Sequence, residues 1–196
     1  MANIFYLMGK SSSGKDTIYQ RLLQKEELAL NSIVQYTTRP IRSNEEDGQE
    51  YHFVTQEQFI ELKDTGRVIE YREYNTCYGI WIYATVQDDY VDINSRDYLM
   101  IGTLESYQKV KEYFGENRVI PLMLECDDGI RLERALLRER SQKQPKYEEM
   151  CRRYLADSAD FSEENQKKAG ISYTFFNDDL ERCLEEMSAF IKSKQL

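Results

Sequence analysis

The chain has few of the residues that bind zinc. Among 196 residues there are four cysteines and a single histidine, His52. The cysteines are 25 or more residues apart and form no C-x-x-C pair; they are Cys77, Cys126, Cys151 and Cys183. Zinc sites usually draw two ligands from such a pair, so no zinc site is expected. We expect reduced thiols in a cytoplasmic protein.

Positive charge and long apolar runs are also scarce. Lys and Arg number 26 against 35 Asp and Glu, a net charge of -9. This balance argues against nonspecific binding to nucleic acid or to anionic membranes, although a basic pocket remains compatible with it. No run approaches the ~18 apolar residues of a membrane span. The opening "MANIFYLMGK" lacks the basic region and the long apolar run of a secretory signal.

What the chain does contain is typical of one soluble globular domain. The apolar fraction is 41% and the charged fraction 31%. Nearly continuous apolar runs, as in a parallel sheet covered on both faces, lie at 3–8, 32–36, 97–102, 118–125 and 171–176. Helical patterns lie between them, at about 15–29, 103–114, 128–140, 145–168 and 179–193. The alternation predicts an α/β fold, with a doubly wound core of about five parallel strands and helices on both faces.

Residues 37–86 break this alternation. Three segments there are rich in Tyr, Val and Ile, and they read "EYHFVT", "RVIEYREY" and "YGIWIYATV". A short helix is predicted over 55–66, opened by a Thr55/Gln58 capping box and closed by Gly66. We expect a small mixed β insert on a core of residues 1–36 and 87–196. Two further pairs are candidate N-caps of later helices, Asp127 with Asp128 and Asn177 with Asp178.

The stretch "IFYLMGKSSSGKDT", residues 4–17, is similar to a phosphate-binding loop. Gly9, Gly14 and Lys15 fit G-x-x-x-x-G-K, but Asp16 stands where Ser or Thr is usual, and the hydroxyl follows at Thr17. Short glycine patterns also arise by chance, yet here an apolar strand precedes the loop and an amphipathic helix follows it. Backbone N–H groups and a lysine at a helix start bind phosphates well. The predicted ATP-binding residues are Gly9, Ser11, Ser12, Ser13, Gly14, Lys15, Asp16 and Thr17.

Asp16 has a physical interpretation as a metal ligand. A carboxylate is a hard oxygen ligand suited to Mg²⁺, as is the hydroxyl that usually fills this place. Its charge opposes phosphate binding unless a cation neutralises it. We therefore predict a Mg²⁺ site that includes Asp16 and Thr17.

A second constellation lies in "YTTRPIRSNEEDGQEYHFVTQEQF", residues 36–59. Arg39, Arg42 and Tyr51 could converge on a small dianion, with Glu45 holding one arginine in place. Taken alone, the segment also fits a solvated, charged hairpin. Because the chain also contains a phosphate-loop motif, we favour the interpretation of this segment as a binding site for a small dianion.

Together these motifs resemble the guanylate kinase family. The run T-T-R-P-x-R-x-x-E-x-D-G-x-x-Y-x-F looks like the nucleotide-acceptor segment of that family. Further features follow in the family's order: Glu70 in "RVIEY", Tyr78 and Gly79 in "CYGI", an Arg-rich segment at 131–153, and "FFNDDLE" at 175–181. The resemblance covers essentially the whole chain. Its 37–53 motif is specific, and the other motifs are individually weak.

The resemblance implies a P-loop kinase with a helical lid at about 134–153. Such enzymes move the γ-phosphoryl group of ATP onto GMP, or dGMP, with Mg²⁺. By similarity Lys15 would hold the donor phosphates. The residues that would bind the acceptor are Gln35, Arg39, Arg42, Glu45, Tyr51, Glu70 and Tyr78. Lys15, Arg39, Arg140 and Arg153 would neutralise charge during transfer, with Arg138 replacing Arg140 if the register differs.

Glu70 would select guanine, because one carboxylate can accept the adjacent N1–H and N2–H₂ groups, an edge that adenine lacks. Three positions depart from the family pattern. Gln35 and Ile80 stand where the family has hydroxyl residues that help to read the base. Ile101, Gly102 and Thr103 stand where it has an acidic D-x-D, and the nearest acid is Glu105.

These departures leave other interpretations open. One keeps the ATP donor but uses another nucleotide or a small phosphorylated acceptor. Another is a non-catalytic guanylate kinase-like binding module, disfavoured because both the phosphate loop and the acceptor arginines are retained. The expected partners are ATP and GMP, with no nucleic acid and no membrane. The oligomeric state is left open, a homodimer included.

Overall fold

The computed structural model describes residues 2–42, 45–76, 79–88, 91–92 and 94–195. Its core is a five-stranded sheet in the order β2-β7-β1-β8-β9, in which every pairing is parallel. The strands are β1 (Ile4–Gly9), β2 (Asn31–Ser32), β7 (Tyr98–Gly102), β8 (Val119–Glu125) and β9 (Thr174–Phe176). The predicted α/β fold with a doubly wound parallel core is confirmed.

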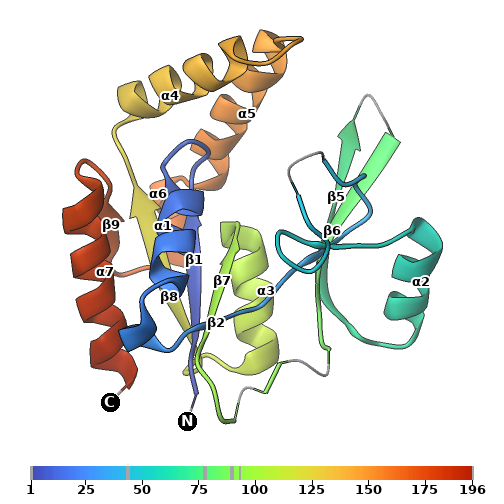
Figure 1. Ribbon diagram of the computed structural model, residues 1–196, viewed down its shortest axis with the longest axis vertical. Coiled ribbons are helices and arrows are strands. Elements are labelled where there is room, and N and C mark those ends of the chain that lie inside the picture. The colour runs from blue at the N-terminus through green and yellow to red at the C-terminus, as the bar shows by residue number, and fades with distance from the viewer. Residues whose placement is uncertain (1, 43–44, 77–78, 89–90, 93, 196) are drawn as a thin grey trace.

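Helices cover both faces of this sheet (Figure 1). Successive residues of β1 point to opposite faces. Phe5 and Leu7 pack with side chains of α1 (Lys15–Leu23) and α7 (Leu180–Gln195). Tyr6 and Met8 pack with side chains of α3 (Leu104–Phe114). Strand β1 is therefore buried on both faces, and the phosphate loop begins at its carboxyl end.

The insert carries a second, four-stranded mixed sheet in the order β4-β3-β6-β5. Its elements are β3 (Tyr36–Thr37), β4 (His52–Phe53), α2 (Gln56–Asp64), β5 (Val68–Thr76) and β6 (Gly79–Val86). A separate small core of Phe59, Ile82, Ala84 and Val86 holds it together. The Thr55/Gln58 capping box is confirmed, and Gly66 follows the helix with a φ of 73°. The insert lies beside the core sheet (Figure 1).

Two consecutive helices project beyond the carboxyl edge of the core sheet (Figure 1). They are α4 (Asp128–Arg140) and α5 (Tyr147–Asp160), and α6 (Glu163–Lys168) leads back to β9. We call α4 and α5 the lid. Asp127 is the N-cap of α4, because its side chain accepts from the N–H groups of Gly129 and Ile130. No residue of α5 is fully buried.

Several expected boundaries were wrong. The run 32–36 is not one strand: β2 ends at Ser32 in the core sheet, and β3 starts at Tyr36 in the insert. Ile33 packs in the core cluster and Tyr36 packs against the insert cluster, so one apolar run serves two cores.

The helix expected over 145–168 is two helices. Ser162 starts α6, because its side chain accepts from the N–H of Asn165. The first helix ends at Leu23 and is followed by a short 3₁₀ turn, η1 (Glu26–Leu28). The last strand begins at Thr174 rather than at residue 171. The side chain that accepts from the first turn of α7 is Asp179, through the N–H of Arg182 at 2.9 Å, and not Asn177 or Asp178.

Within the described ranges, Cys126, Cys151 and Cys183 are free thiols, and Cys77 lies outside those ranges. None of the helices so described has the length and apolar character needed to cross a membrane.

Candidate active site

The phosphate loop connects β1 to α1 through left-handed backbone, which glycine adopts freely and other residues adopt rarely. Ser12 has a φ of 63° and Gly14 a φ of 92°. A side chain on Gly9 would collide with the carbonyl oxygen of Leu124, and one on Gly14 would collide with the side-chain amide of Asn177. Both glycines therefore stand where the chain allows no Cβ. The loop ends at the N-terminus of α1, whose dipole favours an anion.

Three residues from distant parts of the chain hold the outside of this loop. The Asn177 side chain donates to the Ser13 carbonyl at 2.8 Å. Arg131 Nε donates to the Ser11 carbonyl at 3.0 Å, and the Ser11 N–H donates to Asp157 at 2.7 Å. The hydroxyl oxygens of Ser12 and Ser13 are buried without a hydrogen-bond partner. A buried hydroxyl without a partner is costly, so these two groups point to a polar ligand.

Lys15, Asp16 and Thr17 form the first residues of α1. Asp16 and Thr17 are exposed, and Lys15 is half-buried. The charge of Asp16 acts on the hydroxyl of Tyr51 in the insert and helps to raise its pKa. The phosphate loop and the acceptor segment therefore face each other within electrostatic range.

Arg39 and Glu45 make the strongest ion pair of the acceptor segment. Arg39 Nη1 and Nη2 donate to the two Glu45 carboxylate oxygens at 2.9 and 2.8 Å. Arg39 Nη1 also donates to the Pro40 carbonyl, and the Arg42 N–H donates to Glu45 at 2.9 Å. The hydrogen bond from Arg39 holds the pKa of Glu45 below its usual range. The expectation that Glu45 holds an arginine in place is consistent with this geometry.

Aromatic rings surround the same guanidinium. The Arg39 Cζ atom lies 5.6 Å from the ring centroid of Tyr51 and 5.4 Å from that of Phe53. Burial raises the pKa of Tyr51 to about 12, so its hydroxyl stays protonated and can donate to a phosphate. The Arg42 side chain is exposed at the rim of this segment. Tyr78, also predicted to bind the acceptor phosphate, lies outside the described residues.

The predicted base-reading residue, Glu70, is buried in a chain of polar side chains. Thr85 donates to Glu70 Oε1 at 2.8 Å, and Gln35 Nε2 donates to Thr85 at 3.4 Å. On the other side, Arg72 Nε lies 3.4 Å from Glu70 Oε2. Arg72 Nη1 donates to Thr103, the N-cap of α3, at 3.2 Å. Gln35 thus joins the site through Thr85, whereas Ile80 is 46% exposed and belongs to no such contact.

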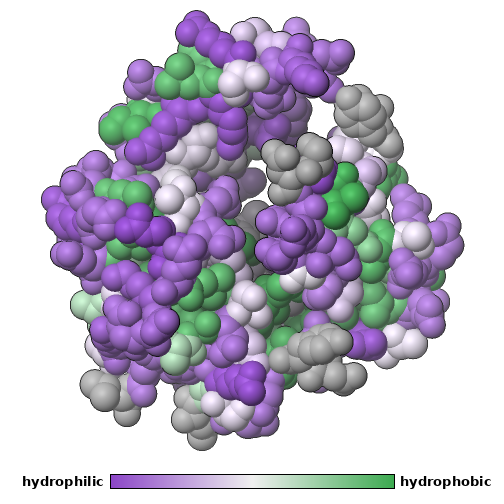
Figure 2. Space-filling model, viewed as in Figure 1, coloured by the Kyte–Doolittle hydropathy of each residue, from purple (hydrophilic) through white to green (hydrophobic). Residues whose placement is uncertain are grey.

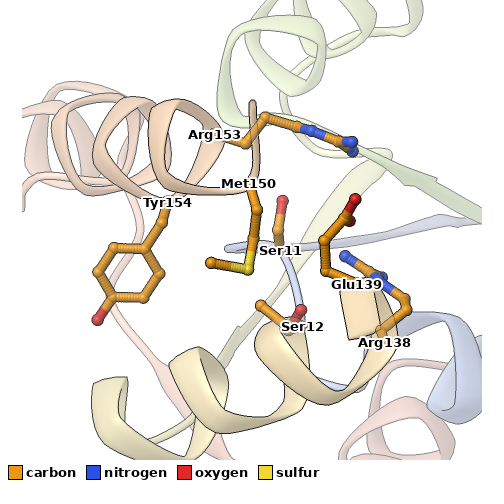
Figure 3. A pocket seen from close by; sticks show the side chains of 8 residues that line it. Ser11, Ser12, Arg138, Glu139, Met150, Arg153 and Tyr154 are labelled. Carbon is orange, nitrogen blue, oxygen red and sulfur yellow. The ribbon is translucent and has the colours of Figure 1, made fainter. Parts of the chain in front are cut away.

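Between the loop and the lid is a small hollow (Figure 3). Ser11 and Ser12 lie between side chains that α4 and α5 contribute, Arg138 and Arg153 among them. Arg140 is exposed and does not line this hollow. Arg153 is also paired with Glu149, whose oxygen lies 3.3 Å from its Nε. The hollow has a volume of about 20 Å³, room for about one water molecule.

The surface is hollowed where the lid, the core and the insert meet, and hydrophilic residues dominate the visible face around this opening (Figure 2). Five contributors to the site were not predicted as such from the sequence: Arg72, Thr85, Arg131, Asp157 and Asn177, the last expected only as a candidate N-cap. Glu70 and Arg72 are two apart on a strand and so share a face, a signal that the sequence did contain. Arg131 opens the Arg-rich segment at 131–153 but was given no role there, and Asp157 belongs to no recognisable motif. Tertiary folding brings both to the loop.

Comparison with known proteins agrees with this architecture. The family model for guanylate kinase matches residues 1–194. The chain is 32% identical over 187 residues to a guanylate kinase of Nitratidesulfovibrio vulgaris, covering 95% of this chain and 84% of that protein. It is 28% identical over 200 residues to a guanylate kinase of Chromobacterium violaceum, covering 100% and 88%. A crystal structure of guanylate kinase from Anaplasma phagocytophilum superposes with a TM-score of 0.69 at 21% identity, covering 100% of this chain and 87% of that one. This last likeness supports the fold.

Proposed function

The chain belongs to the guanylate kinase family, and on this basis we propose that it transfers the γ-phosphoryl group of ATP to GMP or dGMP, giving ADP and GDP or dGDP. One observation carries the proposal. A phosphate loop with two unpartnered buried hydroxyls faces an arginine clamp on the acceptor segment. A kinase needs both a donor and an acceptor site, whereas a binding module needs only one of them.

On the donor side, the loop amides and the start of α1 would hold the ATP phosphates. Lys15 would place its ammonium charge beside the β- and γ-phosphates, and the free hydroxyls of Ser12 and Ser13 would donate to phosphate oxygens. Arg153, with Arg138 beside it at the hollow, would neutralise charge on the transferring group as the lid closes. The geometry favours Arg138 over Arg140 for this role.

On the acceptor side, Arg39 would grip the phosphate of GMP with the N–H groups that Glu45 and Pro40 leave free. A guanidinium has five N–H donors; three are engaged by Glu45 and Pro40, and Tyr83 also lies within hydrogen-bond reach of Arg39. The protonated Tyr51 hydroxyl and the exposed Arg42 would add donors. Glu70 would accept from N1–H and N2–H₂ of guanine. These groups supply alignment and charge neutralisation, which are the main requirements of phosphoryl transfer.

Asp16 and Thr17 fit a Mg²⁺ ion that arrives with ATP. The described residues hold no cluster of three or more His, Cys, Asp or Glu that could bind a metal on its own. Mg²⁺ in kinases typically takes one or two protein oxygens, together with phosphates and water. An exposed carboxylate and a hydroxyl at the start of α1 suit that pattern. When bound, the ion would supply positive charge that neutralises the donor phosphates.

The direct test is ADP release by the purified chain from ATP and Mg²⁺, with GMP, dGMP, AMP, CMP, UMP and dTMP as acceptors. Turnover restricted to GMP and dGMP is the expected result. Turnover with another nucleotide would assign a different acceptor and keep the donor chemistry. This second candidate is favoured by one observation: Ile80, 46% exposed and apolar, stands where the family has a hydroxyl residue that helps to read the base.

A Lys15→Met variant separates an enzyme from a binding module. An enzyme should lose turnover with GMP, since the β- and γ-phosphates lose their point charge. If neither the wild type nor the variant turns over any acceptor, while only the wild type binds ATP, the kinase proposal is excluded and a nucleotide-binding module remains.

A further inference from the structure

A buried pair of opposite charges, Glu70 and Arg72, lies on β5 beside the acceptor clamp. The two residues are two apart on the strand and therefore point to the same side. The Glu70 side chain is fully buried, and only 10% of the Arg72 side chain is exposed. Arg72 Nε and Glu70 Oε2 lie 3.4 Å apart, and neither atom has a hydrogen-bond partner.

One further atom of each group is held by a hydrogen bond. Glu70 Oε1 accepts from Thr85, and Arg72 Nη1 donates to Thr103 at the end of β7. The two side chains are thus fixed from opposite ends, one by the insert and one by the core. What is left unsatisfied is one carboxylate oxygen and one N–H group that face each other.

The pair lies in the acceptor site rather than elsewhere in the insert. The charge of Arg72 acts on the Tyr51 hydroxyl, as do the charges of Arg39 and Asp16. Thr103, the partner of Arg72, stands where the family pattern has the second of the two acidic residues in its D-x-D. Arg72 therefore brings positive charge to a place where the family pattern has negative charge.

Separating such a pair leaves two buried charges, which is costly unless the incoming molecule satisfies both. Guanine can do so. Its O6 and N7 atoms accept, and arginine commonly binds them, while its N1–H and N2–H₂ groups donate side by side. A carboxylate has about four lone-pair sites, so Glu70 can keep Thr85 and still accept both N–H groups. Adenine carries an amino group where guanine has O6, and this would set a donor against the guanidinium.

We propose that Arg72 is a base-reading residue, which donates to guanine O6 while Glu70 accepts from N1–H and N2–H₂. The inference rests on the proposed function, with GMP as acceptor. Binding exchanges the Glu70–Arg72 contact for one contact of each group with the base. Arg72 thereby supplies a donor that Ile80, 46% exposed and apolar, does not.

The test compares GMP with 6-thio-GMP, which differs only in having sulfur, a weak acceptor, in place of O6. The wild type should favour GMP in kcat/KM by about 10- to 100-fold, the range for a hydrogen bond to a charged group. In Arg72→Met this ratio should fall toward one. Glu70→Gln should lower kcat/KM for GMP but keep the ratio, because the Arg72 contact with O6 remains.

Arg67→Met is the matched control. Arg67 directly precedes β5 and donates to the Gln87 carbonyl on the exposed side of the insert, so the ratio should not change. Thermal unfolding establishes that each variant is folded. Arg72→Gln keeps an uncharged donor and should give an intermediate ratio. It also serves as the test if Arg72→Met does not fold.

The inference is overturned if the GMP to 6-thio-GMP ratio of a folded Arg72 variant equals that of the wild type, even with lower turnover. In that case Arg72 would act only through the shape of the site. Failure of the proposed function looks different: the wild type would then not use GMP at all, whichever residue stands at position 72.

Discussion

The side-chain amide of Asn177 donates to the carbonyl of Ser13 across 164 residues of sequence, at 2.8 Å. Asn177 is 3% exposed and follows β9, the strand at one edge of the core sheet. Its amide also lies where a side chain on Gly14 would be. One buried amide therefore fixes the curvature of the phosphate loop from outside.

Asn177→Ala should loosen that loop. The Ser13 carbonyl would lose its partner in a buried position, and the free energy of unfolding should fall by about 1–3 kcal/mol. The KM for ATP should rise several-fold with a smaller change in the KM for GMP. Urea unfolding and initial rates measure the two effects. The neighbouring Asp178→Asn, on an exposed side chain, should change neither.

Glu45→Gln should alter the acid stability of the protein. Arg39 holds the pKa of Glu45 below its usual range. A carboxylate with a lowered pKa stabilises the fold at pH values above its unfolded pKa, about 4.3, and loses this as pH falls through its folded pKa. At pH 7 the variant should be less stable by about 1–2 kcal/mol.

The difference between wild type and Glu45→Gln should shrink as pH falls from about 4.3 through the lowered folded pKa of Glu45, because its carboxyl group is then protonated and, like glutamine, uncharged. Urea unfolding at pH 7, 5, 4 and 3 measures it. A difference that stays constant over this series would mean that the charge of Glu45 contributes nothing.

Asp16→Ser should weaken the use of Mg²⁺. If Asp16 supplies an oxygen to the ion, the Mg²⁺ concentration for half-maximal rate should rise about tenfold or more, given what metal-site mutations typically do. Glu105→Gln is the control, because Glu105 is exposed and paired with Lys109. Unchanged Mg²⁺ dependence and turnover in Asp16→Ser would remove Asp16 from the metal site.

Arg131→Met should destabilise the junction of the lid and the phosphate loop. The Arg131 side chain is 1% exposed, pairs with Asp128 and Asp157, and donates to the Ser11 carbonyl. Its loss leaves a half-buried carboxylate without its cation, so we expect about 3 kcal/mol less stability. Arg152→Met, on the exposed side of α5, should cost no more than ~0.5 kcal/mol. Equal effects of the two variants in urea unfolding would contradict this difference.

Thr103→Asp tests the effect of restoring an acidic residue at the carboxyl end of β7, where the family has its D-x-D. Asp is as good an N-cap as Thr, so α3 should be preserved. The new carboxylate would lie beside Arg72 Nη1, now 3.2 Å from Thr103 Oγ1, and hold the guanidinium more firmly. The KM for GMP should rise several-fold with the KM for ATP unchanged. Thr103→Ser keeps the hydroxyl and should behave as wild type, and an unchanged KM for GMP in Thr103→Asp would count against a role of Arg72 in acceptor binding.

Local signals predicted most of the fold. The order of strands and helices, the glycine loop after β1 and the capping box at Thr55 all follow from patterns within a few residues. The failures occur where neighbouring residues serve different cores. Ile33 and Tyr36 belong to one apolar run but pack in separate clusters, a division that hydrophobicity alone does not encode.

Within the candidate site, too, some residues were predicted from local sequence and others were not. The roles expected for Arg39 and Glu45 were inferred from their residue types in the acceptor segment and agree with the resemblance, and their paired geometry is consistent with both. Arg72 is different, because its importance depends on Thr103, which lies 31 residues further along and comes close only when the insert packs on the core. The role of a buried charge depends on the residues that contact it in the folded chain, and a local sequence pattern does not identify those residues.

Helix α5 has no fully buried residue, and this affects how often it opens locally. A helix with few buried apolar contacts opens locally at a lower free-energy cost than the unfolding of the whole domain, so it opens far more often. Amide hydrogens of α5 should therefore exchange with solvent much faster than those of β1, every residue of which is buried. A nucleotide that bridges the loop and the lid would slow exchange in α5 and leave β1 unaffected. The core strand β1 should therefore stay ordered in all states, whereas the order of the lid helix α5 should depend on the nucleotide bound between it and the phosphate loop.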